Sequence, residues 1–385
     1  MATSPATARP PAALPAALGG LIAMAAGVGI GRFVYTPILP PMIEALGLSK
    51  SEAGLIASSN FLGYLLGALL AATPWLPGPR RAWLLGALAA SALTTGGMGL
   101  TTSLAPFLAM RFAGGMASAL VLILASALVL ERLAEAGRPR LSAVHFAGVG
   151  SGIAVSALAV ALLLMAGQSW QSLWLTSGAL SLAATIAVVL LIPDRPEPAR
   201  PAGRQQRPAA AGSLPRLIGA YGLFGFGYVI TATFLVTIVR TTPEIRPLEP
   251  VIWVVFGLSA APSVAVWARI ANRVGIQTSF AVACLVEAAG VLASVVWPST
   301  AGVFLAAILV GGTFMGLTAL GLVRARGLAA GDPHRTLALM TGAFGTGQIV
   351  GPAFAGMLYD RLGSLTVPSF TAAGALVLAA ILVRR

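Results

Sequence analysis

The chain has 385 residues, of which 57% are hydrophobic and only 9% are charged. Ordinary soluble domains carry roughly 25% charged residues, so this composition excludes a water-soluble globular protein. In a soluble protein, the formal net charge of +13 would indicate nucleic-acid binding. Its meaning here depends on where the 24 lysine and arginine residues lie.

Apolar stretches long enough to cross a bilayer follow one another along the chain. A hydrocarbon core about 30 Å thick needs about 20 apolar residues in a helix. We therefore predict an all-α membrane protein with twelve transmembrane helices. Their approximate bounds are 14–41, 52–75, 82–102, 104–130, 142–166, 170–192, 215–239, 250–270, 278–296, 302–323, 337–358 and 367–383.

The positive charges are distributed unequally between the two sets of loops. With a cytoplasmic N-terminus, eighteen lysine and arginine residues fall on the cytoplasmic side. Four fall on the other side, namely Lys50, Arg240, Arg246 and Arg361. An excess of lysine and arginine marks cytoplasmic loops. The charge is therefore a topology signal and excludes nucleic acid as a partner. We expect a multi-pass protein of the bacterial cytoplasmic (inner) membrane with both termini in the cytoplasm.

A polar linker and an internal repeat divide the chain into two halves. Residues 194–214 are rich in Pro, Arg and Ala and cannot bury a core, so they are read as a cytoplasmic linker. Residues 14–193 and 215–385 form the two six-helix halves, after a disordered cytoplasmic tail at 1–13. A shift of 196 or 197 positions aligns glycine motifs in the first, fourth and fifth helices of each half. This pattern predicts a parallel repeat with a substrate path between the halves.

These features resemble the major facilitator superfamily, whose members have two six-helix halves. Residues 111–118 (RFAGGMAS) are similar to its fourth-helix motif. Residues 269–275 (RIANRVG) and 356–363 (GMLYDRLG) are similar to its loop motif G-x-x-x-D-R-x-G, with Asn272 where the acid usually stands. The resemblance implies a gating role for residues in these two segments, which are Arg269, Asn272, Arg273, Gly275, Asp360 and Arg361.

A tighter resemblance runs over nearly the whole chain. Residues 29–40 (GIGRFVYTPILP), 225–234 (GFGYVITATF) and 345–352 (GTGQIVGP) look like features of the YbfB/YjiJ-like bacterial transporters. This resemblance implies a transporter that works by alternating access, and it names no substrate.

Charges inside predicted spans are functional candidates, because an arginine at a helix centre costs about 2.5 to 3.5 kcal/mol on insertion scales. We expect Arg32, in the first helix, to attract an anionic or strongly polar group of the substrate. The alternative is a structural arginine bonded to carbonyls that Pro37, Pro40 and Pro41 leave free. Further substrate-binding candidates are polar and aromatic side chains grouped on helix faces, for which packing is the alternative role. They are Tyr35, Asn60, Tyr64, Tyr228, Thr231 and Gln348.

Three residues are candidates for proton coupling. Arg111 follows the family motif, and an inter-helix structural bond is its alternative role. Glu287 is the only acid predicted deep in a span, where a carboxyl group can carry a proton or serve as a protonated scaffold residue. The unperturbed pKa of an imidazole suits proton exchange by His145, although a lone histidine at such a position more often has a structural role.

The absence of certain sequence motifs limits which energy source could drive transport. The only lysine is Lys50, so the chain has no Walker A loop for ATP. With two histidines and one cysteine, we expect no metal and no other cofactor. We predict a proton-coupled exporter of a small organic solute, with an anion favoured by Arg32. Its partners would be that solute, protons and lipid. The sequence leaves the oligomeric state open and is compatible with a monomer.

Two other function classes remain as alternatives. A membrane-embedded enzyme acting on lipid would need a constellation such as G-x-S-x-G or H-E-x-x-H, and the chain has neither. A sensor or receptor without flux would bind a ligand and move nothing, so a transport assay compared with ligand binding separates it from a transporter.

Overall fold

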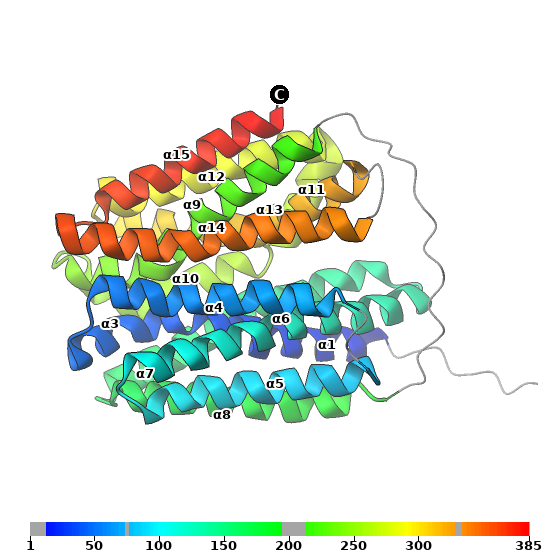
Figure 1. The fold of residues 1–385 in the computed structure, drawn as a ribbon, viewed down its shortest axis with the longest axis horizontal. Helices are drawn as coiled ribbons and strands as arrows, with labels where there is room; N and C mark the ends of the chain where they lie inside the picture. The colour runs from blue at the N-terminus through cyan, green and yellow to red at the C-terminus, as the bar shows by residue number, and fades with distance from the viewer. Residues whose placement is uncertain (1–12, 74–76, 195–212, 329–332, 385) are drawn as a thin grey trace, which may run out of the picture.

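The structure is a computed structural model that describes residues 13–73, 77–194, 213–328 and 333–384. In these residues it is an all-helical bundle without strands, elongated along the helix axes (Figure 1). The predicted tail and linker lie almost entirely outside the described residues.

The first half comprises α1 to α8. Its first crossing is built from α1 (Ala13–Met24), a π-helical segment (Ala25–Ile30), α2 (Gly31–Phe33) and α3 (Tyr35–Leu46). The remaining helices are α4 (Lys50–Ala71), α5 (Arg80–Gly97), α6 (Leu104–Glu135), α7 (Ser142–Met165) and α8 (Trp170–Leu191).

The second half repeats this arrangement with α9 to α15, which lie together on one side of the bundle in Figure 1. Its helices are α9 (Leu214–Thr241), α10 (Glu249–Ala260), α11 (Ser263–Val274), α12 (Ile276–Val296), α13 (Thr300–Leu328), α14 (Pro333–Leu362) and α15 (Thr366–Arg384).

The helix lengths agree with a multi-pass membrane protein. Within the described residues, ten helices are long and apolar enough to cross a membrane, and the bent pair α10 and α11 makes an eleventh. The pair bends by 43°, next to Pro262, which has no N–H for the helix ladder. The 30 residues of α14 give it the length of a twelfth crossing, so twelve helices are compatible with the structure.

Large apolar side chains cover much of the outer surface of the bundle. Leu93 is 69% exposed, Ile186 61% and Leu190 76%, and many others exceed 40%. Apolar surface on this scale would cause a soluble monomer to aggregate, whereas lipid chains cover it in a bilayer.

The two halves meet along pairs of helices that carry small residues. α4 packs on α14 and α7 packs on α10. An ideal Cβ on Gly54 would lie 2.2 Å from the carbonyl oxygen of Pro352, and one on Gly150 would lie 2.2 Å from the main-chain nitrogen of Ala261. Glycine at these positions allows the backbones of the two halves to touch.

The axis that relates the halves passes between α3 and α9. The Thr36 hydroxyl donates to the carbonyl of Ala232 at 2.7 Å, and Glu44 pairs with Arg240. In both pairs the partners are 196 residues apart. Equivalent residues of a two-fold repeat can meet only beside the axis, so the repeat seen in the sequence is present in space. We call the end of the bundle where α3 turns into α4 the Gly47 end, and the opposite end the terminal end.

Candidate functional site

The first crossing is irregular at its centre, and Arg111 supports the irregular segment. A π-helical turn precedes α2, and a break at Val34 separates α2 from α3. From α6, Arg111 donates through Nη1 to the carbonyl of Gly31 and through Nη2 to the carbonyl of Arg32, both at 2.9 Å. Arg111 is buried, so water does not compete for these charge-assisted bonds. Both terminal nitrogens of Arg111 are therefore committed to the main chain.

The second half braces the proline-rich part of the same crossing. Pro37 has no N–H to offer the carbonyl of Phe33, four residues earlier. The indole Nε1 of Trp253 in α10 donates to that carbonyl at 3.2 Å. Of the carbonyls that the three prolines leave free, that of Phe33 is bonded by Trp253, while Arg111 bonds the preceding carbonyls of Gly31 and Arg32.

Two of the predicted substrate-binding residues bond to the main chain of the first half. The Tyr35 hydroxyl donates to the carbonyl of Ala53 at 2.8 Å. The Asn60 amide donates to the carbonyl of Arg111 at 2.9 Å. Both residues are buried and tie α3, α4 and α6 together within one half.

Arg32 is a buried cation without an anionic partner in the described structure. The residue is 6% exposed, and its guanidinium carbon lies 4.2 Å from the ring centroid of Tyr64, 4.7 Å from that of Phe61 and 5.3 Å from that of Phe33. Among the described residues, Arg32 Nε and Nη2 have no hydrogen-bond partner. Cation–π contacts with three aromatic rings, and not an ion pair with a carboxylate, therefore stabilise the Arg32 charge among the described residues.

Tyr228 and Gln348 lie across the interface from Arg32, in the second half. The Gln348 amide nitrogen donates to the Tyr228 hydroxyl. The Arg32 charge acts on the hydroxyls of both Tyr64 and Tyr228, so the groups of the two halves lie near one another. In the part of the chain that the structure describes, Gln348 Oε1 and the Thr231 hydroxyl lack a partner. Tyr228 is also the repeat equivalent of Arg32, 196 positions later.

The aromatic stripe on α9 packs against neighbouring aromatic rings. The Tyr228 ring stacks on Phe314 at 5.6 Å and on Phe344 at 5.9 Å, and Tyr221 stacks on Phe344 at 4.9 Å. All four residues are buried. We call this aromatic surface the Tyr228 wall; its polar groups are the Tyr228 hydroxyl and the Gln348 amide.

Glu287 lies behind the Tyr228 wall, on α12. It is fully buried, and its Oε1 accepts a hydrogen bond from the Thr313 hydroxyl at 3.0 Å. Its Oε2 has no partner among the residues described. The Glu287 charge acts on Tyr228, which in turn senses Arg32. Tyr228 therefore lies within electrostatic range of Glu287.

His145 occupies a tight packing position on α7. It is fully buried, with Nε2 at 3.0 Å from the Ser126 hydroxyl and its ring 4.8 Å from that of Phe146. An ideal Cβ on Gly20 would lie 2.4 Å from His145 Nδ1, so α1 approaches the imidazole closely.

The loop-motif residues separate to opposite ends of the bundle. Arg269, Asn272 and Arg273 are exposed at the C-terminal end of α11, towards the terminal end. Gly275 follows with φ of +86°, a conformation that side chains disfavour and glycine accepts. The other copy of the motif, with Asp360, lies at the Gly47 end.

Asp360 caps a helix of the opposite half. Its Oδ1 accepts from the backbone N–H of Lys50 at 3.1 Å and its Oδ2 from that of Ser51 at 2.9 Å. These N–H groups open α4, where the helix dipole is positive. Burial alone would raise the pKa of Asp360, but the hydrogen bonds from Ser51 and Lys50 outweigh burial and hold the pKa below its usual value. The neighbouring Arg361 is exposed.

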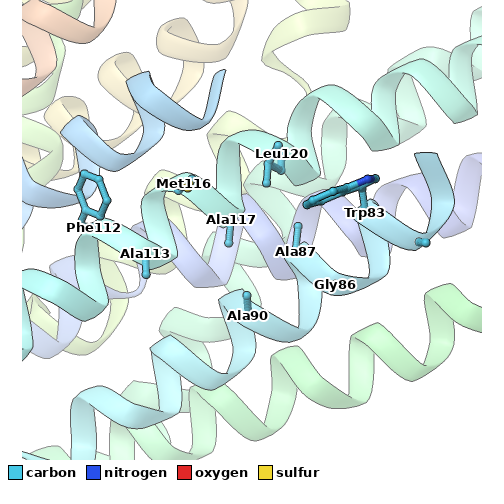
Figure 2. Close-up of a pocket in the computed structure, with 10 residues that line it drawn as sticks. Trp83, Gly86, Ala87, Ala90, Phe112, Ala113, Met116, Ala117 and Leu120 are labelled. Atoms are coloured by element: carbon cyan, nitrogen blue, oxygen red, sulfur yellow. The ribbon is translucent and has the colours of Figure 1, made fainter. Parts of the chain in front are cut away.

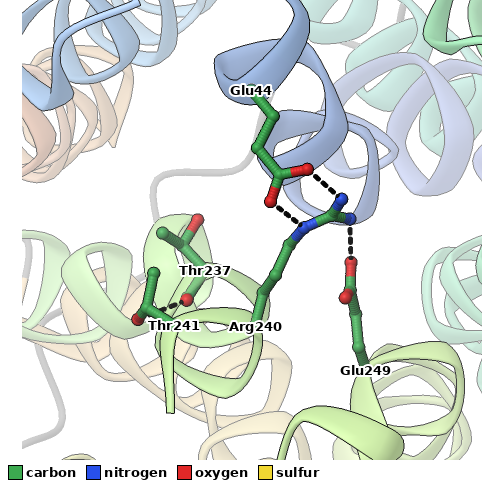
Figure 3. A network of polar contacts seen from close by, with 5 residues as sticks. All are labelled: Glu44, Thr237, Arg240, Thr241 and Glu249. Carbon is green, nitrogen blue, oxygen red and sulfur yellow. Dashed lines mark hydrogen bonds and ion pairs between the residues drawn. The ribbon is translucent and has the colours of Figure 1, made fainter. Parts of the chain in front are cut away.

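A three-residue ion network closes the same end (Figure 3). Arg240 Nε donates to Glu44 at 2.6 Å, and Arg240 Nη1 donates to Glu249 at 2.8 Å. Arg240 also pairs with Glu44 through Nη2. Glu44 belongs to the first half and the other two residues to the second. Together with Asp360, this network fastens the halves at the Gly47 end.

Comparison with known proteins decides the family. A family model described as "Uncharacterised MFS-type transporter YbfB" matches residues 24–384, nearly the whole chain. The chain belongs to this YbfB family. The family resemblance and the fold class predicted from the sequence are therefore confirmed, and the protein is a multi-pass membrane transporter and not an enzyme.

Solved structures of other transporters share the fold. A mutant form of the nucleoside transporter NupG has a TM-score of 0.71 at 16% identity, covering 96% of this chain and 99% of its own. The human organic anion transporter MFSD10 (TETRAN) has a TM-score of 0.68 at 18% identity, covering 97% and 100%. A bacterial homologue of the human lysosomal transporter Spinster, inward-facing and unoccupied, has a TM-score of 0.68 at 14% identity, covering 98% and 96%. No curated protein sequence matches the chain.

The Asp360 cap of this YbfB-family transporter predicts a pH effect on the Gly47 end. Because contact with α4 lowers the pKa of Asp360, the cap is fully formed above the usual value of 3.8 and is lost as pH falls through the lowered pKa. We expect spin labels at Ala45 and Glu244, both exposed, to move apart as pH falls below this value. Asp360→Asn should favour the longer distance already at neutral pH. A distance unchanged by both acid and substitution would contradict the prediction.

An apolar groove between α5 and α6 lies apart from these residues (Figure 2). It has a volume of about 490 Å³ and is lined by apolar side chains such as Trp83, Phe112, Met116 and Leu120. None of the predicted site residues lines it, so the polar chemistry of this transporter lies elsewhere.

Sequence reasoning missed several residues that hold the two halves together. Trp253 was read as part of an apolar span, and Glu44 and Arg240 as loop charges. The repeat offset was a usable signal, because Glu44 and Arg240 are equivalent positions with opposite charges. Phe61 gave no such signal, since an aromatic residue in a membrane helix is ordinarily packing.

Proposed function

We propose that this YbfB-family protein is a proton-coupled secondary transporter that exports a small organic anion across the bacterial inner membrane. The single observation that carries the proposal is Arg32, a cation buried between the halves with no carboxylate beside it among the described residues. A charge that lacks an anionic protein partner inside a membrane protein is expected to serve a ligand. The human organic anion transporter MFSD10 shares this fold and supports an anionic solute.

The charge distribution supports an orientation for the bundle. With eighteen lysine and arginine residues on the side of both termini, the terminal end faces the cytoplasm and the Gly47 end faces outward. The bonds that join the halves around Glu44, Asp360 and Thr36 then lie on the outer side. This supports a conformation that is closed to the outside. Rocking of the two halves against each other around a central site would alternate access.

Glu287 is the coupling residue that we favour among the three candidates. Its carboxyl group is fully buried, has one free oxygen in the described structure, and acts electrostatically on Tyr228. Arg111 uses both terminal nitrogens on main-chain carbonyls, and His145 lies in a packed contact with Gly20.

A flux experiment tests the proposal. We expect a pH gradient across liposomes containing the purified protein to drive solute accumulation, measured over a panel of small organic anions, amines and neutral compounds. Glu287→Gln keeps the acceptor for Thr313 and removes the titrating group. It should reduce gradient-driven flux at least about tenfold, as expected for removal of a proton-transfer group, while solute exchange without a gradient persists. His145→Gln is the matched control, with flux retained. Flux that ignores the pH gradient in the wild type would overturn proton coupling.

A further inference from the structure

The guanidinium of Arg32 has one complete edge free of hydrogen bonds in the described structure. The Nε–H and one N–H of Nη2 point in the same direction from the planar group and form a two-pronged donor. Both atoms are buried, and neither has a partner among the described residues. The two free donors are thus neighbours on a single edge rather than scattered over the side chain.

This edge differs from that of the other arginine at the centre of the first half. Arg111 fills both of its Nη groups with carbonyls of Gly31 and Arg32. The free edge of Arg32 lies beside the same irregular segment, yet no carbonyl of the described residues accepts from it. Instead, the guanidinium lies against the rings of Tyr64, Phe61 and Phe33. A ring face offsets positive charge but cannot accept two parallel hydrogen bonds, so the donor edge stays unfilled.

The geometry of the free edge selects among anions. A carboxylate presents two oxygens in one plane and accepts two parallel N–H bonds from the side of a guanidinium. It also carries a single charge, which matches the one cation at this place. A phosphate dianion would need further donors or a second cation, and within the described residues Arg111, the other buried arginine of this region, is already engaged.

We infer that the free Nε and Nη2 edge of Arg32 is the receptor for a carboxylate group of the transported solute. This inference rests on the proposed function and narrows its substrate class to organic monocarboxylates. The bond forms when movement of the halves exposes the edge, since both atoms are covered in the present conformation. Tyr228 and Gln348, near Arg32 across the interface, then face the remainder of the solute.

A binding experiment on the full-length protein tests the inference. The probes are small monocarboxylates, aliphatic and aromatic, each paired with its own carboxamide, and binding is measured by thermal shift and by calorimetry. We expect carboxylates to bind and each matched carboxamide to bind about 100-fold more weakly, because two charge-assisted bonds are lost. Arg32→Lys keeps the charge and lacks the planar edge, so it should weaken carboxylate binding at least about tenfold. Arg140→Lys, at an exposed position between α6 and α7, is the control and should bind as the wild type does.

Three results would overturn the inference. They are equal affinity for a carboxylate and its amide, wild-type affinity in Arg32→Lys, and the absence of any Arg32-dependent binding across the panel. The paired ligands keep the test valid even if Arg32→Lys fails to fold. Failure of the proposed function looks different. Carboxylate binding without gradient-driven flux would contradict coupled transport but support the carboxylate site. Flux restricted to amines or neutral solutes would support transport but contradict the carboxylate site.

Discussion

Replacing Arg111 with leucine is expected to lower the free energy of unfolding by about 2 to 6 kcal/mol, because two buried carbonyl groups each lose their charged donor. Arg111 is 3% exposed and supplies hydrogen bonds to the carbonyls of Gly31 and Arg32. Its loss leaves two buried acceptors without this donor at the irregular centre of the first crossing. Unfolding of the purified protein by heat or denaturant measures the effect.

Arg111→Lys is the matched variant for this prediction. Its single ammonium group cannot reproduce the fork that reaches two carbonyls, so it should recover only part of the stability. The pair also separates the two roles that the sequence left open for Arg111. Loss of stability and flux together indicates the structural bond. Unchanged unfolding with a lost dependence of flux on the pH gradient would instead indicate proton coupling and contradict the prediction.

Arg32 and Arg111 illustrate what sequence reasoning could and could not reach. Their location inside apolar spans was enough to mark both as candidates, because charge in a membrane helix is costly. Their different environments depend on which carbonyls of the first crossing are free and which side chains reach them. Trp253 takes the carbonyl next to Arg32 from a helix more than 200 residues away, and no local pattern predicts that.

The fold could be predicted from the sequence more completely than the candidate site, for a physical reason. Helix number follows from apolar length, and the parallel repeat follows from glycine motifs at one offset, so both are encoded in local patterns. The interface between halves depends on pairs such as Asp360 with the start of α4, 309 to 310 residues apart. The loop motif drew attention to Asp360 and implied gating, but the acid caps a helix of the opposite half, which only the three-dimensional arrangement reveals.

Adding a methyl group at both Gly54 and Gly356 is expected to prevent closure at the Gly47 end and to reduce flux at least about tenfold, while the two halves stay folded. Both glycines lie where α4 and α14 touch across the interface. An ideal Cβ on Gly54 would lie 2.2 Å from the Pro352 carbonyl oxygen, and one on Gly356 would lie 2.1 Å from the Lys50 carbonyl oxygen. Backbone atoms cannot rotate away, so the halves must separate, and the spin-label pair at Ala45 and Glu244 should report a longer distance.

Two alanine controls separate an effect on closure from an effect on folding. A Cβ on Gly115 would lie 1.9 Å from the Asn60 carbonyl oxygen, inside the first half, so Gly115→Ala should lower unfolding stability without selectively opening the Gly47 end. Gly374 has open space around it, so Gly374→Ala should leave flux and spin-label distance unchanged. Each alanine favours its helix by about 1 kcal/mol over glycine, so helix propensity cannot explain a loss. Gly54→Ala/Gly356→Ala with wild-type distance and flux would mean that the contact between α4 and α14 does not control closure.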